Sequence, residues 1–449
     1  MQSIFGTDGI RGIYKKGITD LLAQRIGFAF GNISKKKKKV LIGRDTRLSG
    51  EFLLKALSHG LHASGKEVFD IGICPTPMIP FLIKNFKDCT GIMISASHNP
   101  PEYNGIKIFD ENGNKLNKTK EIEIENHLKT INQNDLFSKK DNHIIKRFDF
   151  LEIYERSLIE SVDNHNLNGI KIIIDNCHGS ATSCAENVFK RLGANIHVIN
   201  SSFDGSKINV NCGSTCLEPI KKAMNEFNAD LGFSFDGDAD RVVGIDSLGN
   251  VLDGDHILFL WGRELMKRKI LPGNLLISTV MANLGFERAW NQIGGKLIRT
   301  PVGDKFIHSE ILKQKAHLGG EQSGHILSKI NNYSGDGLLT AIQMANFCST
   351  KNIIFKDWLE TSFKAFPQKL SNIKLYSNDT NFKNALEINT NLIIKKKLKN
   401  ISEPCRIFAR NSGTEPVLRI LVEAENKHLV DEISKEMTKI VENINKQKN

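Results

Sequence analysis

One pattern occurs three times along this chain and constrains its fold more than any other feature. A short apolar run is followed by an amphipathic segment, a glycine and a second short apolar run at residues 40–72, 171–200 and 275–301. Strand, helix and strand in this order make a βαβ unit, whose parallel strands are buried on both faces. The copies recur at the length of a domain, which is too long for a solenoid repeat. The pattern therefore predicts three similar α/β domains.

The amphipathic segment of the first copy shows the helical part of this pattern. Four leucines fall on one face of a helix there: Leu53, Leu54, Leu57 and Leu61. Ser49 precedes these leucines, and we expect it to be the N-cap of the helix.

The end of the chain has a different pattern. Residues 405–425 are expected to form two strands around a glycine-containing turn. Residues 426–444 are expected to form a closing helix, with apolar positions at Leu429, Ile433, Met437 and Ile440. The polar stretch 371–391 is expected to hold the earlier elements of this smaller α+β domain. The predicted domains are residues 1–147, 148–250, 251–366 and 367–449.

Composition excludes several classes of protein. Of the 449 residues, 40% are hydrophobic, enough for several cores, and the apolar run 257–261 is far shorter than a membrane span. The first residues lack the layout of a signal peptide. Eight scattered cysteines without a Cys-x-x-Cys pair predict reduced thiols, and neither a disulfide framework nor a zinc site. We expect a cytoplasmic protein that binds no membrane.

The net charge of +11 raises the question of nucleic-acid binding. The clearest basic runs, Lys35–Lys39 and Lys395–Lys397, contain no interleaved aromatic or arginine residues. Base stacking and bidentate phosphate contacts would favour such residues. A solvated surface is therefore favoured over a nucleic-acid surface.

The most informative acidic cluster is Asp236, Asp238 and Asp240, which directly follows a strand-like run. Alternating carboxylates in a looping segment project their oxygens to one side, which suits a hard cation such as Mg²⁺. Three carboxylates in one short turn repel one another unless a cation offsets their charge. An EF-hand is excluded because its sixth and twelfth positions would be Arg241 and Ser247. A plain acidic turn is the alternative.

A second cluster ends another apolar strand. Residues 95–100 read Ser-Ala-Ser-His-Asn-Pro, and residues 104–107 read Asn-Gly-Ile-Lys. The carboxyl end of a buried strand is where α/β domains present functional groups. No Ser-His-Asp arrangement is visible, and a hydroxyl near three carboxylates and a metal suits phosphoryl transfer better than acyl transfer. A capped turn without function is the alternative.

Two more segments have the composition of ligand-binding loops. Residues 319–325, Gly-Gly-Glu-Gln-Ser-Gly-His, offer hydrogen-bonding groups for sugar hydroxyls. Residues 410–416, Arg-Asn-Ser-Gly-Thr-Glu-Pro, with Arg419 beyond them, offer guanidinium, hydroxyl and backbone N–H groups that suit a phosphate monoester. Each alone is more often an ordinary turn. One such cluster in every expected domain favours a functional interpretation. The Gly-x-Gly-x-x-Gly fingerprint is absent, and residues 60–66 fail as a P-loop because Glu67 follows the lysine.

In this order, the four segments resemble the α-D-phosphohexomutase superfamily along the whole chain. They look like its phosphoserine loop at 95–100, metal loop at 236–241, sugar loop at 320–325 and phosphate loop at 410–416. Other segments are similar to the bacterial phosphoglucosamine mutases: 5–12, 278–285, 302–307 and 412–416. The resemblance implies three α/β domains with mixed, largely parallel sheets and a smaller α+β domain, arranged around a central cleft.

The resemblance also implies a function. The chain would convert glucosamine 6-phosphate to glucosamine 1-phosphate for UDP-N-acetylglucosamine synthesis, through a 1,6-bisphosphate of glucosamine or glucose. A phosphomannomutase or phosphoglucomutase, which uses the same loops, is the alternative. A metal-dependent phosphatase would need no clamp for a second phosphate. The partner would be a sugar phosphate, with no nucleic acid or membrane, and a homodimer is compatible with the resemblance.

The implied site residues follow from the same resemblance. Ser97 would be phosphorylated and would bind Mg²⁺ together with Asp236, Asp238 and Asp240. Lys107 would be a general acid/base whose pKa its neighbours depress. The remaining residues would form the electrostatic cradle and the substrate contacts: Arg11 and Arg241 for the cradle, and Glu321, Ser323, Arg410, Ser412, Gly413, Thr414 and Arg419 for the substrate.

Some positions depart from the subfamily pattern. Ala239 stands in the metal loop where glycine is usual, and Lys305 stands where arginine is usual. Glu102 and Tyr103 precede Asn104 where an aspartate is commoner, and Asn411 replaces a lysine or proline. No nucleophile or carboxylate is lost. Lys305 keeps its charge but loses bidentate geometry, so the resemblance assigns it no role.

Overall fold

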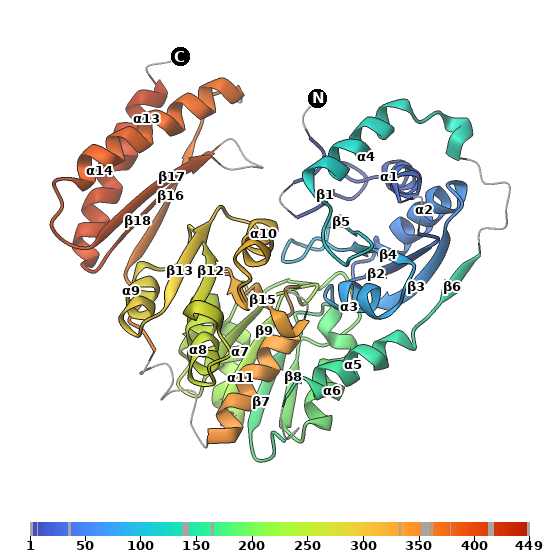
Figure 1. Cartoon of the computed structure of the whole chain (residues 1–449), viewed down its shortest axis with the longest axis horizontal. Helices are drawn as coiled ribbons and strands as arrows, with labels where there is room; N and C mark the ends of the chain where they lie inside the picture. Colours follow the sequence, from blue (N-terminus) through green and yellow to red (C-terminus); the bar gives the residue numbers. More distant parts are fainter. Residues whose placement is uncertain are drawn as a thin grey trace. The chain divides into compact units, whose positions relative to one another are not determined.

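The computed structural model describes residues 3–6, 8–34, 37–136, 143–162, 166–331, 334–351, 360, 362–377, 379–411 and 417–446 (Figure 1). These residues form four sheets, of six, five, four and three strands. The chain divides into two compact units: residues 1–280 with 298–361, and residues 281–297 with 362–449. None of the eight cysteines is in a disulfide. No helix among the described residues has the length and apolar character needed to cross a membrane.

The first sheet has the strand order β1-β5-β4-β2-β3-β6. Strands β4, β2, β3 and β6 pair in parallel, whereas β5 is antiparallel to both β4 and β1. Its elements in chain order are β1 (Ile10–Ile13), α1 (Asp20–Ile33), β2 (Lys39–Arg44), α2 (Gly50–Ala63), β3 (Glu67–Ile73), α3 (Met78–Asn85), β4 (Cys89–Ile94), β5 (Tyr103–Phe109), α4 (Lys118–Thr130), η1 (Gln133–Leu136) and β6 (Ile144–Lys146).

One hydrophobic core joins helices α1, α2 and α4 to this sheet. The four leucines of α2 named above are all buried, so the predicted apolar face is confirmed. Ser49 is the N-cap residue of α2, as predicted. Ser49 lies directly before α2, but its side chain caps no helix N–H group. Its hydroxyl accepts a hydrogen bond from Asn104 Nδ2 at 2.8 Å instead, because β5 brings that amide within reach.

The second sheet has the strand order β11-β10-β9-β7-β8 and is also mixed. Strand β7 pairs in parallel with β8 and β9, and β10 is antiparallel to β9 and β11. Its elements are α5 (Phe150–Glu160), β7 (Lys171–Asp175), η2 (Ser180–Ser183), α6 (Ala185–Arg191), β8 (Asn195–Ile199), α7 (Glu218–Phe227), β9 (Leu231–Phe235), β10 (Val242–Asp246) and β11 (Val251–Leu252).

The third sheet has the order β13-β12-β14-β15, with β12 parallel to β14 and β14 antiparallel to β15. Its elements are α8 (Gly254–Lys267), η3 (Pro272–Asn274), β12 (Leu275–Thr279), α9 (Leu284–Gln292), β13 (Lys296–Thr300), α10 (Asp304–Gln314), β14 (Leu318–Gly320), β15 (Ile326–Ser328), η4 (Lys329–Asn331) and α11 (Gly337–Lys351). All three predicted strand–helix–strand copies are therefore present, as β2-α2-β3, β7-α6-β8 and β12-α9-β13.

The second compact unit contains the smaller C-terminal sheet. Its order is β16-β18-β17, with both pairs antiparallel. Its elements are β16 (Gln368–Lys374), α13 (Thr380–Leu398), β17 (Cys405–Asn411), β18 (Val417–Ala424) and α14 (Lys427–Lys446). The helix α9 belongs to this unit: Glu423 Oε1 accepts a hydrogen bond from Leu284 N at 2.6 Å, and Arg406 donates to Ala282 O at 3.0 Å.

The four predicted functional loops occupy equivalent places in the four sheets. Each begins where a strand ends and leads into an antiparallel neighbour, at β4-β5, β9-β10, β14-β15 and β17-β18. The first three loops are therefore hairpin connections, and residues 412–416 of the fourth lie outside the described residues. The units β2-α2-β3 and β7-α6-β8 have parallel strands. The sequence predicted two strands joined by a turn only for residues 405–425.

Candidate active site

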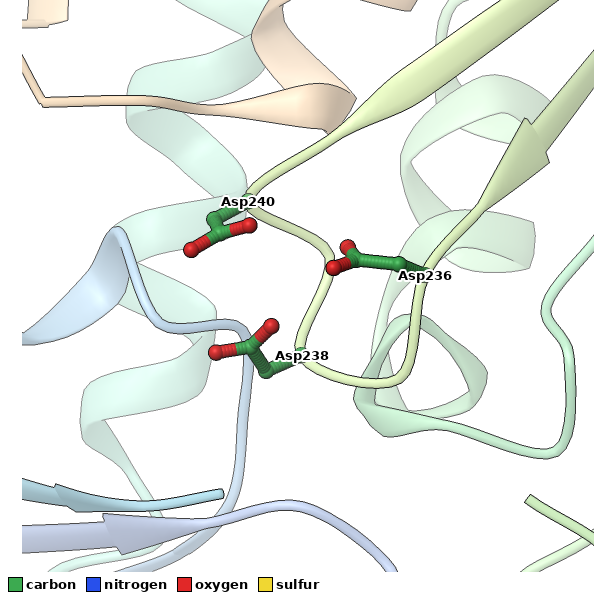
Figure 2. A group of neighbouring side chains, drawn as sticks. All are labelled: Asp236, Asp238 and Asp240. Carbon is green, nitrogen blue, oxygen red and sulfur yellow. The ribbon is translucent and has the colours of Figure 1, made fainter. Parts of the chain in front are cut away.

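The metal loop follows β9 and presents three buried aspartates. One carboxylate oxygen from each of Asp236, Asp238 and Asp240 lies within 4.8 Å of the other two. Figure 2 shows the three carboxylates pointing from the loop toward a common centre. Ala239 takes a left-handed conformation, with φ of 55°, at the position where the subfamily usually has glycine. Glycine adopts this conformation without strain and alanine does not.

These three side chains fit a divalent cation. Burial, together with the charges of Asp240 and Asp238, raises the pKa of Asp236 to about 8, so its ionised form needs a compensating positive charge. Asp238 Oδ1 is buried, and no donor among the described residues bonds to it. Three carboxylate oxygens of this kind are a suitable donor set for Mg²⁺.

The serine loop brings Ser97 onto the metal loop. Ser97 is fully buried and its Oγ donates a 2.5 Å hydrogen bond to Asp236 Oδ2. His98 Nδ1 lies 3.2 Å from the same Oγ. Burial lowers the pKa of His98 to about 4, and Arg241 and Arg11 contribute to the shift. The hydroxyl therefore lies between a carboxylate that could bind a metal ion and a neutral imidazole.

Lys107 contacts two of the three aspartates directly. Its Nζ lies 2.7 Å from Asp238 Oδ2, 2.8 Å from Asp240 Oδ2 and 3.0 Å from Asp8 Oδ2, and the side chain is 1% exposed. Burial alone would lower the pKa of Lys107, but the three carboxylates outweigh burial and raise it well above its usual value. The expectation that its neighbours depress this pKa is wrong, because sequence spacing did not show which charges surround the ammonium.

Four further side chains complete a ring of alternating charge: Asp8, Lys115, Asp304 and His325. No role is predicted from the sequence for the first three, and His325 is the last residue of the predicted sugar loop. Lys115 Nζ contacts Asp8 and lies 2.5 Å from Asp304 Oδ2. His325 lies 3.6 Å from Asp304 and 3.4 Å from Asp240, which closes the ring. Burial opposes ionisation of Asp8, but Lys107 and Lys115 lower its pKa well below the usual value. Asp8 and Asp304 lie in the motifs 5–12 and 302–307, and these motifs could have pointed to both residues. Lys115 lies in no motif that the sequence analysis singled out.

The two cradle arginines lie beside this ring. Arg11 donates to Asn99 Oδ1 at 2.9 Å and to Asp8 Oδ2 at 3.2 Å. The backbone N–H of Arg241 donates to Asp236 Oδ1 at 3.2 Å, and its Nε lies 3.8 Å from Asp240 Oδ1. The structure thus places both guanidinium groups near the serine and metal loops.

The sugar loop follows β14 in the same compact unit. Glu321 is half-buried and its Oε1 accepts a hydrogen bond from Gly303 N at 3.1 Å, whereas Ser323 is exposed. A cavity of about 530 Å³ lies near this loop, between the segment 109–118 and helix α10. Asp240, Lys115, Asp304, His325 and Lys305 are among its lining residues. Its size is that of a small-molecule site.

The phosphate loop lies in the second unit and is only partly described. Arg410 on β17 and Arg419 on β18 are directly opposite each other, and both are half-buried. Three predicted contacts, Ser412, Gly413 and Thr414, lie outside the described residues.

Comparison with known protein families covers most of the chain. Models of the four phosphoglucomutase/phosphomannomutase domains match it in order: alpha/beta/alpha domain I at residues 2–135, domain II at 152–249, domain III at 253–366 and the C-terminal domain at 370–440. The chain belongs to this family of phosphohexomutases and is an enzyme of the isomerase class.

Individual relatives refine this assignment. Phosphoglucosamine mutase of Prochlorococcus marinus (strain MIT 9215) is 58% identical over 98% of each chain, and that of Synechococcus sp. (strain WH7803) is 45% identical over 96% of this chain and 93% of its own. A phosphoglucomutase/phosphomannomutase family protein from Burkholderia thailandensis has the same fold, with a TM-score of 0.81, 23% identity and 98% coverage of each chain. Within the family, the sequence relatives place this chain among the phosphoglucosamine mutases.

Proposed function

We propose that this mutase interconverts glucosamine 6-phosphate and glucosamine 1-phosphate by passing a phosphoryl group between Ser97 and the sugar. The observation that carries the proposal is the 2.5 Å contact between Ser97 Oγ and Asp236, inside a triad of carboxylates that Lys107 also contacts. The choice of sugar rests on the relatives named phosphoglucosamine mutase.

The reaction would begin with a phosphoryl group on Ser97. A free hydroxyl of the sugar phosphate attacks that phosphorus, the bond to Ser97 Oγ breaks, and a 1,6-bisphosphate forms. After the bisphosphate turns around, Ser97 takes the other phosphoryl group. Lys107, which its raised pKa keeps protonated at the start, would give a proton to Ser97 Oγ as that bond breaks and would take up the proton that the attacking sugar hydroxyl loses. Glucosamine or glucose 1,6-bisphosphate would prime Ser97.

Asp236, Asp238 and Asp240 would hold Mg²⁺ together with an oxygen of phosphorylated Ser97. A bound Mg²⁺ supplies positive charge that offsets the charge on the transferred phosphoryl oxygens and on the carboxylates. Arg11 and Arg241 would add positive charge from the protein itself, since both lie beside the serine and metal loops.

The substrate contacts would come from the sugar and phosphate loops. Glu321 and Ser323 would bind sugar hydroxyls. The phosphate that does not react would contact Arg410, Ser412, Gly413, Thr414 and Arg419. Arg410 and Arg419 are directly opposite each other on adjacent strands, so their two guanidinium groups could contact the same phosphate. The same grip on either phosphate of the bisphosphate would let one site serve both directions.

The decisive experiment measures the intact mass before and after exposure to glucose 1,6-bisphosphate. We expect a gain of one phosphoryl group, mapped to Ser97. Ser97→Ala should gain none and should lose turnover while keeping its fold, since one buried oxygen is removed. Ser95→Ala keeps the Ser97 hydroxyl, so the phosphate that it takes up should still map to residue 97. A phosphate mapped to Ser95 in the wild type would contradict the assignment.

The sugar preference needs a separate measurement. Glu321 would contact hydroxyls that glucose and glucosamine share, so the 2-amino group must be recognised elsewhere. A hydrogen bond to a charged group is worth ~1–3 kcal/mol, which corresponds to about one to two powers of ten in kcat/KM. We expect kcat/KM for glucosamine phosphate to exceed kcat/KM for glucose phosphate and for mannose phosphate by that factor. Faster turnover of glucose or mannose phosphate would favour a phosphoglucomutase or phosphomannomutase and leave the phosphoserine chemistry intact.

Three further parts of the proposal concern the cell and the assembly. The enzyme would act in the cytoplasm, bind no nucleic acid or membrane, and form a homodimer. Sedimentation equilibrium tests the dimer. Binding of random DNA that weakens steeply with salt would contradict the absence of a nucleic-acid partner.

A further inference from the structure

Ser97 has an unusual backbone conformation for a serine. Its φ is 52°, in the left-handed region that residues with a Cβ rarely adopt. Such a conformation is strained and persists only where the surrounding structure holds it. It also sets the direction in which Oγ points, because the side chain turns with the backbone. The groups that hold this loop therefore control where the nucleophile lies.

Arg47, between β2 and α2, is the principal group that holds the loop. It is 2% exposed, and each of its five N–H donors has an acceptor. Nε donates to Asp45 Oδ2 at 3.0 Å. Nη1 donates to the carbonyl of Pro100 and, at 2.9 Å, to the carbonyl of Tyr103. Nη2 donates to the carbonyl of Ser97 at 3.0 Å and to that of Asn99 at 2.7 Å. One guanidinium thus binds three carbonyls of the serine loop and the carbonyl of Tyr103, where β5 begins.

Asn209, which belongs to the domain of the second sheet, binds two of the same carbonyls. It lies between β8 and α7, and its Nδ2 donates to Ser97 O at 2.8 Å and to Asn99 O at 2.9 Å. The metal loop fits closely against this contact. A Cβ on Gly237 would lie 2.6 Å from Ser97 O and 3.0 Å from Asn209 Nδ2. Glycine at 237 therefore lets the serine and metal loops approach each other.

The amide of Ser97 is held as firmly as its carbonyl. Ser97 N donates to Ser95 Oγ at 2.8 Å, and Ser95 Oγ donates to Asp45 Oδ2 at 2.7 Å. The same Asp45 oxygen accepts from Arg47 Nε. Both backbone polar groups of Ser97 are thus tied to Arg47, directly or through Ser95 and Asp45.

We propose that Arg47 and Asn209 form a carbonyl clamp, a pair of positioning residues that holds Ser97 in its left-handed conformation and aims Oγ at the metal triad. This inference rests on the proposed function of Ser97. Neither residue would touch substrate. Loss of either one lets the loop relax toward an unstrained conformation, which moves Oγ away from Asp236. Phosphoryl transfer should then slow, while sugar binding through other loops remains.

Asn209 offers a test with little risk to the fold, because it is only half-buried. Asn209→Gly keeps the left-handed backbone at φ of 59° and removes the two hydrogen bonds. The matched control is Asn211→Gly, an exposed asparagine two residues away with φ of 52°. We expect kcat of Asn209→Gly to fall by about tenfold or more, as for a misplaced reacting group, with KM within about twofold. Asn211→Gly should match the wild type.

Arg47 is tested by Arg47→Lys, with Arg44→Lys as control. Arg44 lies at the end of β2, and its guanidinium pairs with Asp70 at 2.8 Å and accounts for none of the hydrogen bonds described above for the serine loop. A lysine at 47 keeps the charge but cannot reach four carbonyls and Asp45 together, so the rate of Ser97 phosphorylation by glucose 1,6-bisphosphate should fall more than with Asn209→Gly. Added guanidinium should restore part of the rate in Arg47→Ala.

The outcomes separate this inference from the proposed function. The proposed function is supported if the wild type turns over and carries phosphate on Ser97, and it fails if either result is absent. With both present, equal kcat in Asn209→Gly and Asn211→Gly would overturn the clamp. A fall in unfolding temperature with unchanged kcat per folded molecule would also overturn it, because that result describes a structural role alone.

Discussion

At the scale of the residue, the site shifts the pKa values of Asp236 and Asp240 in opposite directions, although they are only four positions apart. Asp240 lies beside Lys107 and His325. Burial opposes its ionisation, but Lys107 and then His325 bring the pKa of Asp240 well below the usual value. Asp236 lies beside the neutral Ser97 hydroxyl, and its pKa is raised to about 8 by burial and by the other two aspartates. Different pKa values on similar groups are typical of sites that move protons and charge. Asp236, the carboxyl group whose ionised form most needs a nearby cation, therefore lies on the Ser97 side, where the transferred phosphoryl group and its metal are proposed.

The metal triad leads to a prediction for Asp238→Asn. This change removes an anionic oxygen ligand and should weaken Mg²⁺ binding and turnover together. Thermal unfolding with and without Mg²⁺ checks binding independently of activity, since a ligand that binds the folded state raises the unfolding temperature. We expect Mg²⁺ to stabilise the wild type more than the variant. Chelation should stop wild-type turnover, and full turnover in excess chelator would remove the triad from the mechanism.

At the scale of the element, helix α11 begins at a buried carboxyl group. Asp336 precedes α11, and its Oδ1 accepts a hydrogen bond from Leu339 N at 2.9 Å. Its Oδ2 accepts from the hydroxyl of Tyr154, on α5, at 2.9 Å. The carboxyl group therefore caps one helix and ties it to another. Burial raises the pKa of Asp336 to about 6, despite these hydrogen bonds.

The raised pKa predicts how stability depends on pH. Because the folded-state pKa lies above the ordinary value of 3.8, the folded protein binds more protons between these two pH values, and the contribution of Asp336 to stability falls as pH rises. Asp336→Asn stays neutral and lacks this dependence. Between pH 4 and 7, the stability of the wild type relative to Asp336→Asn should fall by about 2 kcal/mol, measured by urea unfolding. A constant difference across this range would contradict the raised pKa.

At the scale of the whole molecule, the chain consists of two units with separate cores. Leu57 belongs to the core of α1, α2 and the first sheet, and Met437 belongs to the core of the C-terminal sheet. Both side chains are fully buried. Separate cores allow separate unfolding transitions, so a single two-state curve is not expected.

Two cavity-forming variants test this division. Leu57→Ala and Met437→Ala should each lower the free energy of unfolding of their own unit by ~2–5 kcal/mol. Differential scanning calorimetry should show a different transition shifted in each variant. Leu21→Ala is the control, because that side chain is 54% exposed. A common shift of one transition by both core variants would show that the molecule unfolds as a single unit.

The sequence by itself determined the repeated strand–helix–strand units and the four loops. Both are local signals: apolar spacing defines helix and strand faces, and unusual polar runs at strand ends mark the loops. The leucine face of α2 and the closeness of Asp236, Asp238 and Asp240 could be predicted for this reason. The residue assignments beyond these rested on family resemblance.

Only the tertiary structure decided which charges meet. Lys115 and Asp304 are 189 positions apart, and Arg47 reaches carbonyls 50 to 56 positions away. No spacing rule connects such positions, because their contact depends on how sheets and loops pack. For the same reason, the sequence could not show that the pKa of Lys107 is raised. The direction of this shift depends on burial and on Asp8, Asp238 and Asp240, which the fold brings to one ammonium group from distant parts of the chain.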